Sequence, residues 1–154
     1  MNNGLKNKHY ILLAIMAFLH FLAMYVIMYS MVDRSANLFL NLNQVYMAAL
    51  MTMPMLILEL SLMNFMYPNK KMNHLIIIFS IIALVMFFVF IRQQTAISDE
   101  QFLRSMIPHH AGAILMCEKA PLQDSAIKDL CEEIILNQQE EIDWMKERLK
   151  EIRD

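Results

Sequence analysis

Hydrophobic and polar positions divide the chain near residue 95. Before that point lie three long apolar runs, at about residues 10–31, 45–67 and 74–91. Each run is long enough to cross a hydrocarbon core roughly 30 Å thick as an α-helix. After that point apolar residues recur at steps of three and four between charged ones, a spacing typical of packed amphipathic helices. The pattern predicts a membrane domain over residues 1–94 and a helical segment over 95–154.

The apolar spacing after residue 95 predicts a helical hairpin. One seam runs through residues 102, 106, 109, 113, 116 and 120, and the other through 131, 135, 138, 142, 145, 149 and 152. Ser98 suits the N-cap of the first helix, Pro121 marks a short turn, and Asp124 suits the N-cap of the second helix. Helices joined by so short a turn are antiparallel neighbours. Because one pair of helices buries only a thin core, we expect two copies to form a homodimeric four-helix bundle.

Composition agrees with an all-α membrane protein. Of 154 residues, 58% are hydrophobic, and two Gly and four Pro are too few turn residues for an all-β fold. The formal net charge of −2 gives no reason to expect nucleic acid as a partner. Methionine is unusually frequent, with sixteen residues. Thioethers fill irregular apolar gaps, and they also select soft ions such as Cu(I).

The distribution of basic residues predicts the orientation in the membrane. The side of the N-terminus carries four lysines, Lys6, Lys8, Lys70 and Lys71. The opposite side has only Arg34, next to Asp33, and Arg92 before the soluble segment. The positive-inside rule therefore predicts a multi-pass protein of the inner (plasma) membrane with a cytoplasmic N-terminus. The hairpin then lies in the periplasm or outside the cell. The first run shows no signal-peptide cleavage site, and we expect it to be retained.

Residues 106–117 gather two adjacent histidines, two thioethers and a thiol on a helix of the hairpin. Antiparallel folding places His110 opposite Gln138, and Met145 close to Leu103. Imidazole with thioether favours copper, because hard cations prefer oxygen and structural zinc sites prefer thiolates. The simpler alternative is that such a histidine is a satisfied core residue. The sequence predicts copper, as Cu(I), at His109 and His110 with Met106 and Met116 beside them, and with Gln138 behind these ligands.

Cys117 and Cys131 lie opposite each other in the same antiparallel register, and three interpretations are open. They form a disulfide, they are metal ligands in reduced form, or they are small seam residues. An oxidised pair is favoured outside the cytoplasm.

Motifs in the soluble segment resemble a known family. They are Asp99, Phe102, Met-Ile-Pro-His-His at 106–110, Ala113-Ile-Leu-Met116, Ile134, Ile135, Gln138, Glu141-Ile142 and Met145. Together these positions resemble the signature of the domain of unknown function 305 family, which includes periplasmic copper-binding proteins of the CopM type. The resemblance covers about 50 residues and implies a ferritin-like helical bundle. It also implies ligands at Met106, His109, His110, Met116 and Met145. Many members carry two hairpins, so the single hairpin here agrees with a dimer.

Two stripes of methionine in the membrane runs suggest a second role. One stripe has Met47, Met51, Met55, Glu59 and Met63 at steps of four, and the other has Met16, His20, Met24 and Met28. An ionisable residue within a span indicates a functional site by default. Pairing of His20 with Glu59 is the structural alternative. The functional alternative is a copper path through His20, Met24, Met47, Met51, Met55 and Glu59, similar to Ctr-type transporters but without the GxxxG motif of their third span.

These patterns predict a membrane-anchored copper-binding protein for copper tolerance, storage or hand-off outside the cytoplasm. The expected partners are a copper ion, a second copy of the chain and the lipid bilayer. No nucleophile is paired with a base, and no Glu-x-x-His pair of a di-iron bundle is present, so we do not expect an enzyme. The first alternative is a copper transporter that uses the hairpin as a collector. The second is a structural or sensory bundle without metal, in which the histidines pack or respond to pH.

Overall fold

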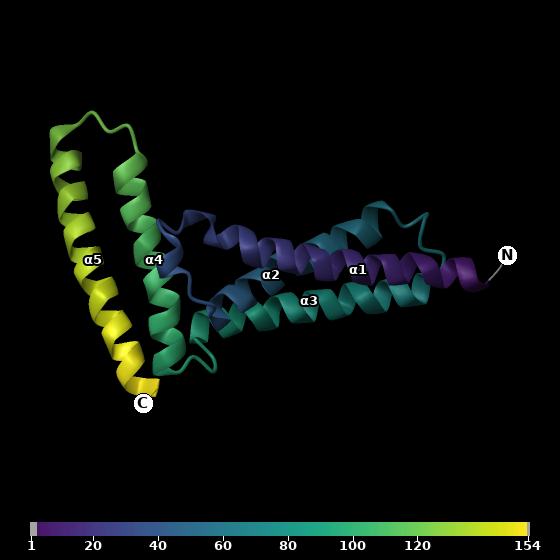
Figure 1. The fold of residues 1–154 in the computed structure, drawn as a ribbon. Coiled ribbons are helices and arrows are strands. Elements are labelled where there is room, and N and C mark those ends of the chain that lie inside the picture. The colour runs from purple at the N-terminus through teal and green to yellow at the C-terminus, as the bar shows by residue number, and fades with distance from the viewer. Residues whose placement is uncertain (1–2, 154) are drawn as a thin grey trace. The chain divides into compact units, whose positions relative to one another are not determined.

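The computed structural model describes the backbone of residues 3–153 and the side chains of residues 8–152. This part of the chain is helical throughout and has no strand, in agreement with the predicted all-α class. Figure 1 shows the elements in chain order: α1 (Asn3–Ile27), η1 (Met28–Met31), η2 (Ser35–Asn37), α2 (Leu42–Leu62), α3 (Lys70–Gln93), α4 (Asp99–Lys119) and α5 (Ser125–Arg153).

The chain forms two compact units. The first contains residues 1–27 and 45–95, and the second contains residues 28–44 and 96–154. The boundary near residue 95 is where the sequence pattern changes. The predicted division assigned residues 28–44 to the membrane domain, whereas the structure packs this linker with the hairpin. Apolar periodicity could not reveal this, because the linker joins the hairpin through long-range hydrogen bonds and through Val32 and Phe39, two isolated apolar residues that pack against the hairpin core.

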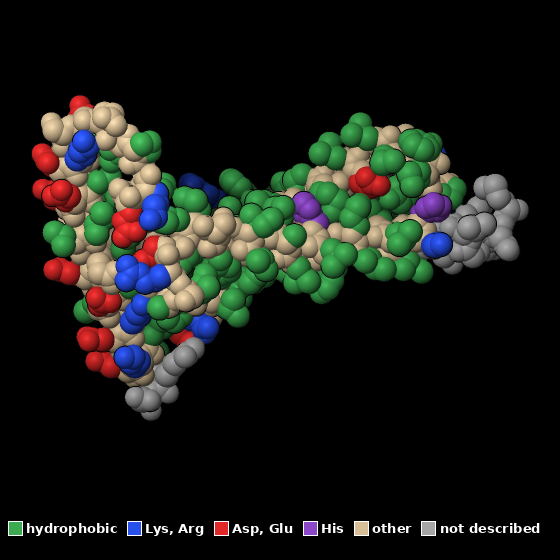
Figure 2. Space-filling view, turned by 45° about the horizontal axis from the view of Figure 1, so that its top comes forward, with side chains coloured by type: hydrophobic (Ala, Val, Ile, Leu, Met, Phe, Trp, Pro, Cys, Tyr) green, Lys and Arg blue, Asp and Glu red, His purple; other side chains and the backbone are tan. Residues whose placement is uncertain are grey.

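The first unit contains most of three helices that are long and apolar enough to cross a membrane, as predicted. The ends of two of these spans, residues 28–31 and 42–44, belong to the second unit. These spans are Lys8–Met31, Leu42–Leu62 and Lys70–Gln93. Their surfaces are almost uniformly apolar, whereas acidic and basic side chains gather over α4 and α5 (Figure 2). Small residues are buried between the helices and let the helix backbones approach closely. Close packing matters in a bilayer, because the hydrophobic effect does not drive helices together there. They are Ala48, Ala49, Thr52, Ser80 and Ala83.

The second span ends earlier than predicted. Helix α2 stops at Leu62 rather than at Tyr67, and a turn follows in which Tyr67 N donates to Asn64 O (3.3 Å). Pro68 explains the difference, because a residue that precedes proline is disfavoured in the helical region. Helix α3 then begins at Lys70, where the Asn69 side chain accepts a hydrogen bond from the Met72 N–H. The helix cap therefore starts this span four residues before the predicted position.

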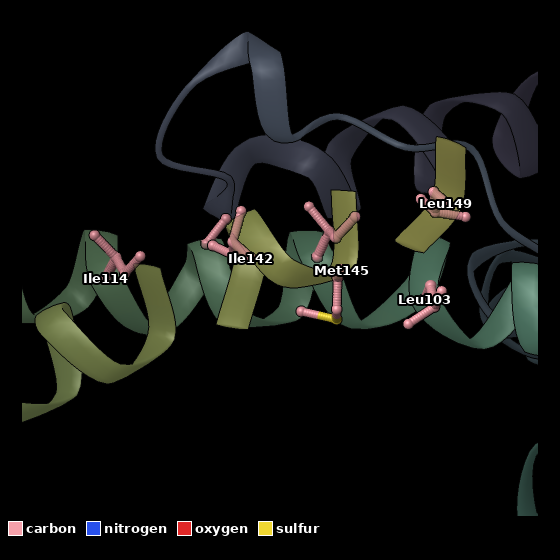
Figure 3. Close-up of a cluster of buried hydrophobic side chains, with 7 residues drawn as sticks. Leu103, Ile114, Ile142, Met145 and Leu149 are labelled. Atoms are coloured by element: carbon pink, nitrogen blue, oxygen red, sulfur yellow. The ribbon is translucent and has the colours of Figure 1, made fainter. Parts of the chain in front are cut away.

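The hairpin of α4 and α5 forms as predicted, but the predicted seam of α4 is wrong. Positions 102, 109, 116 and 120 are exposed, and α4 buries Leu103, Ile107, Ala111 and Ile114 instead. The Ser98 side chain caps α4 by accepting from Gln101 N–H, and Asp124 Oδ1 caps α5 by accepting from Ile127 N (3.1 Å). The helices lie side by side and antiparallel (Figure 1). Their shared core contains Leu103, Ile107, Ala111, Ile114, Ile142, Met145 and Leu149, and five of these are labelled along the helix–helix seam in Figure 3.

The linker of residues 28–44 lies on α4 and α5 as a third layer of the second unit. Gln101 Oε1 accepts from Leu42 N (2.9 Å), and Lys146 Nζ donates to Oδ1 of the fully buried Asn37 (2.6 Å). Gly112 admits the backbone of η1, since a Cβ added there would lie 3.4 Å from Met31 O. The hairpin thus buries polar groups of the linker as well as its own apolar seam.

The seam supplies the stability of the second unit. Replacing the fully buried Ile142 with Ala should lower the free energy of unfolding by about 2–5 kcal/mol, because it leaves a cavity in a packed core. Leu136→Ala, on the same helix at an exposed position, is the matched control and should change it by less than about 0.5 kcal/mol. The fluorescence of Trp144, the sole tryptophan, reports urea unfolding of this unit. Equal effects of the two changes would contradict the packing described here.

Candidate functional site

A pocket of about 240 Å³ opens between α4 and α5. Residues one helical turn apart line it on each side, so the same spacing that builds the seam also builds the pocket. Its walls are Phe102, Leu103, Met106, His110, Glu141, Trp144 and Met145. Three of the five predicted metal ligands, Met106, His110 and Met145, therefore lie in one place.

Both ring nitrogens of His110 have polar partners. Nδ1 lies 2.9 Å from Met106 O, and Nε2 lies 2.5 Å from Glu141 Oε2. A carbonyl oxygen only accepts, so Nδ1 carries a hydrogen. In a neutral imidazole Nε2 would then be a lone pair facing a carboxylate, and two acceptors repel each other. A proton or a metal ion between the two atoms makes this contact favourable.

The two side chains of this contact differ in exposure. The Glu141 side chain is 57% exposed, whereas His110 is only 7% exposed. The His110 ring is held from both ends by Met106 O and Glu141. Nε2 is thus the ring atom that would bind a metal ion in this pocket.

Two thioethers complete the donor set of the pocket. Met106 lies one turn before His110 on α4 and is half-buried, and Met145 lies one turn after Glu141 on α5 and is 5% exposed. No group of three or more His, Cys, Asp or Glu that could hold a metal is found among the described residues. A metal in this pocket would therefore depend on sulfur. One imidazole, two thioethers and one carboxylate fit a soft ion such as Cu(I) and fit hard cations poorly.

The structure does not bring the other two predicted ligands into the pocket. His109 is exposed, and its ring centroid lies 6.0 Å from that of His110 on a different face of α4. Met116 is 54% exposed and lies about 15 Å along the helix from Met106. The reason is helical rotation, since consecutive residues diverge by about 100° and ten residues advance nearly three turns.

The residue opposite His110 also differs from the predicted one. Glu141, rather than Gln138, faces the imidazole, and Gln138 is half-buried without lining the pocket. Gln138 and Glu141 lie on one face of α5, one turn apart. The register estimated from the sequence was therefore wrong by one helical turn. Trp144 and Phe102, which flank the pocket, were not predicted as site residues. Phe102 lies one turn before Met106, and Trp144 lies three residues after Glu141. This helical spacing was the signal in the sequence that could have identified them.

The two cysteines are joined in a disulfide with a Cα–Cα distance of 5.2 Å. Of the three interpretations that the sequence left open, the structure has this one. The bond links α4 to α5 near the turn and removes both thiols from the set of free donors. Imidazole and thioether groups are therefore the soft ligands that remain in this unit.

The predicted membrane path is only partly assembled. Glu59 accepts a hydrogen bond from the Tyr67 hydroxyl (2.9 Å), and no bond joins it to His20 among the described side chains. Burial, together with the Glu59 hydrogen bond, raises the pKa of Tyr67 to about 12, so its hydroxyl stays protonated and donates. Glu59 lies three residues before the end of α2, and His20 lies seven before the end of α1. In consecutive spans these positions are at different depths, which explains why the pair does not form. Along α2, Met47 is exposed and Met51 and Met55 are half-buried.

Comparison with known proteins places the chain in a family. Residues 90–149 match the family described as Domain of unknown function (DUF305). The chain is also similar to an uncharacterized protein of Acanthamoeba polyphaga mimivirus, with 38% identity over 114 residues, 73% of each chain. So long an alignment cannot fit within residues 90–154, so the similarity reaches into the membrane helices. No solved structure matches the chain. The chain belongs to the DUF305 family, and this confirms the family resemblance found in the sequence.

Proposed function

We propose that the protein binds copper, as Cu(I), in the pocket between α4 and α5, for copper tolerance, storage or hand-off outside the cytoplasm. The observation that supports this most directly is the convergence of Met106, His110 and Met145 with Glu141 on one pocket. Partners at both ring nitrogens would also satisfy a core histidine without metal, so the two thioethers beside His110 are what favours copper. A binding role is proposed rather than an enzymatic one, because no nucleophile lines the pocket.

The alternative of a copper transporter receives less support. A path along the membrane stripes was expected to use His20 with Glu59, and Glu59 is instead bonded to Tyr67 near one end of α2. The donors that do converge lie in the second unit. The alternative of a metal-free sensory bundle remains as the outcome in which the pocket binds only protons.

Methionine-methyl NMR with Ag⁺, an air-stable substitute for Cu(I), tests the pocket. On titration of the detergent-solubilised full chain, the ε-methyl signals of Met106 and Met145 should shift together. His110→Ala should weaken this binding by roughly 100-fold or more, because loss of an outer partner alone typically costs about 10–100-fold. Met106→Leu with Met145→Leu keeps the side-chain volume and should abolish it. His109→Ala is the matched control and should leave these shifts in place. Unshifted Met106 and Met145 signals in the wild type would refute the proposal.

We further propose that the N-terminus is cytoplasmic and that the second unit lies on the opposite side, in the periplasm or outside the cell. Three spans place residues 28–44 and 96–154 on the same side of a membrane. Packing of these two segments into one unit agrees with that requirement. The disulfide agrees with an oxidising compartment.

Cysteine labelling tests this orientation cleanly, because Cys117 and Cys131 are bonded to each other. A membrane-impermeant maleimide should label Glu147→Cys on α5 in intact cells. It should label Lys71→Cys on α3 only after the membrane is opened. Both positions are exposed in the structure, so accessibility to the reagent differs only by the side of the membrane. The reverse pattern would contradict the proposed orientation.

We also propose that two copies of the chain pair their hairpins into a four-helix bundle. Large apolar side chains of α4 and α5 remain exposed in the single chain, among them Phe102, Ile127, Leu130 and Trp144. Burial of such residues is the usual drive for association of helices in water.

A further inference from the structure

His109 and Met116 are the two soft donors of α4 that the pocket does not use. On a helix with about 100° per residue they lie about 20° apart, so they form one stripe two turns long. Gly112 lies between them, three residues after the first and four before the second. Both donors are exposed, and neither has a hydrogen bond that would occupy it among the described contacts.

The linker brings a third donor to this stripe. Met31 of η1 lies over Gly112, with its Cβ 3.8 Å from the position that a Cβ of Gly112 would occupy. Side chains three or four positions apart on a helix are about 5–6 Å apart at Cβ. The flexible Met31 side chain, 47% exposed, can therefore reach the neighbours of Gly112 on both sides. A Cβ at position 112 would be in van der Waals contact with Met31, so η1 lies directly against α4 at this point.

The 3₁₀ geometry of η1 adds a fourth donor. Residues at i and i+3 of a 3₁₀-helix eclipse each other, so Met28 projects from the same edge of η1 as Met31. Met31, His109 and Met116 thus lie next to Gly112, and Met28 is the next thioether along the same edge of η1. All four are neutral donors, and none is an oxygen ligand.

We propose that His109, Met116, Met31 and Met28 form a second binding site for a soft monovalent cation, Cu(I) or Ag⁺, on the face of α4 that carries the linker. Neutral sulfur and imidazole donors bind such ions without loss of a proton from a thiol, and they discriminate against hard divalent cations. The site differs from the pocket in having no carboxylate and in being exposed. The identity of the ion rests on the proposed function, but the arrangement of the donors does not.

Methionine-methyl NMR separates the two sites in one titration. Ag⁺ added to the full chain in detergent should shift the ε-methyl signals of Met31 and Met116 as well as those of Met106 and Met145, and the chain should bind a second ion. Met31→Leu with Met116→Leu should remove the second ion and keep the pocket signals. Each change conserves volume, so the fold should persist. Met72→Leu, at an exposed methionine of α3, is the matched control.

The outcomes for the two proposals are distinguishable. His110→Ala should abolish the Met106 and Met145 shifts and leave the Met31 and Met116 shifts in place. Shifts at Met106 and Met145 alone would overturn the second site and leave the proposed function standing. Shifts at Met31 and Met116 alone would support the second site and overturn the pocket. Shifts at none of these methyls would overturn both.

Discussion

The register of α4 against α5 determines which side chains meet in the pocket of the second unit. Near the turn the disulfide between Cys117 and Cys131 ties the two helices together. Further along, fully buried Ile107 and Ile142 interlock in the seam. Between a covalent tie and a packed core the helices cannot slide by a turn without opening a cavity. This fixed register brings His110 to Glu141 and aligns Met106 with Met145 around one pocket.

The linker between α1 and α2 extends the same constraint to a third element. Its contacts are mostly polar, and they compensate groups that would otherwise be buried without partners. Asn37 is fully buried, and its side-chain amide donates to Asp33 and its oxygen accepts from Lys146. Asn41 caps the start of α2 and also donates to Arg104 O. Because a buried amide without partners is costly, these bonds specify one position of the linker on α4.

The sequence predicted where the helices lie better than it predicted which residues contact one another. Helix spans and caps at Ser98 and Asp124 follow from local rules, namely hydrophobic length and side-chain bonds to free N–H groups. The docking of residues 28–44 does not, because it depends on hydrogen bonds between segments about 60 or more residues apart. The partner of His110 also depends on tertiary register. The predicted seam placed Gln138 opposite His110, whereas the structure places Glu141 there, one turn further along α5.

The adjacent histidines show why a cluster of ligands in sequence is not one site in a helix. Two consecutive side chains diverge by about 100°, so His109 and His110 cannot both point into a seam as narrow as that between α4 and α5. His110 lies in the seam, where Met106 O and Glu141 orient its ring. The other must face outward, and here it faces outward beside Gly112, where η1 approaches most closely. A pair of histidines on one helix therefore serves two surfaces, and the residues that accompany each one, rather than the pair itself, determine what each surface can bind.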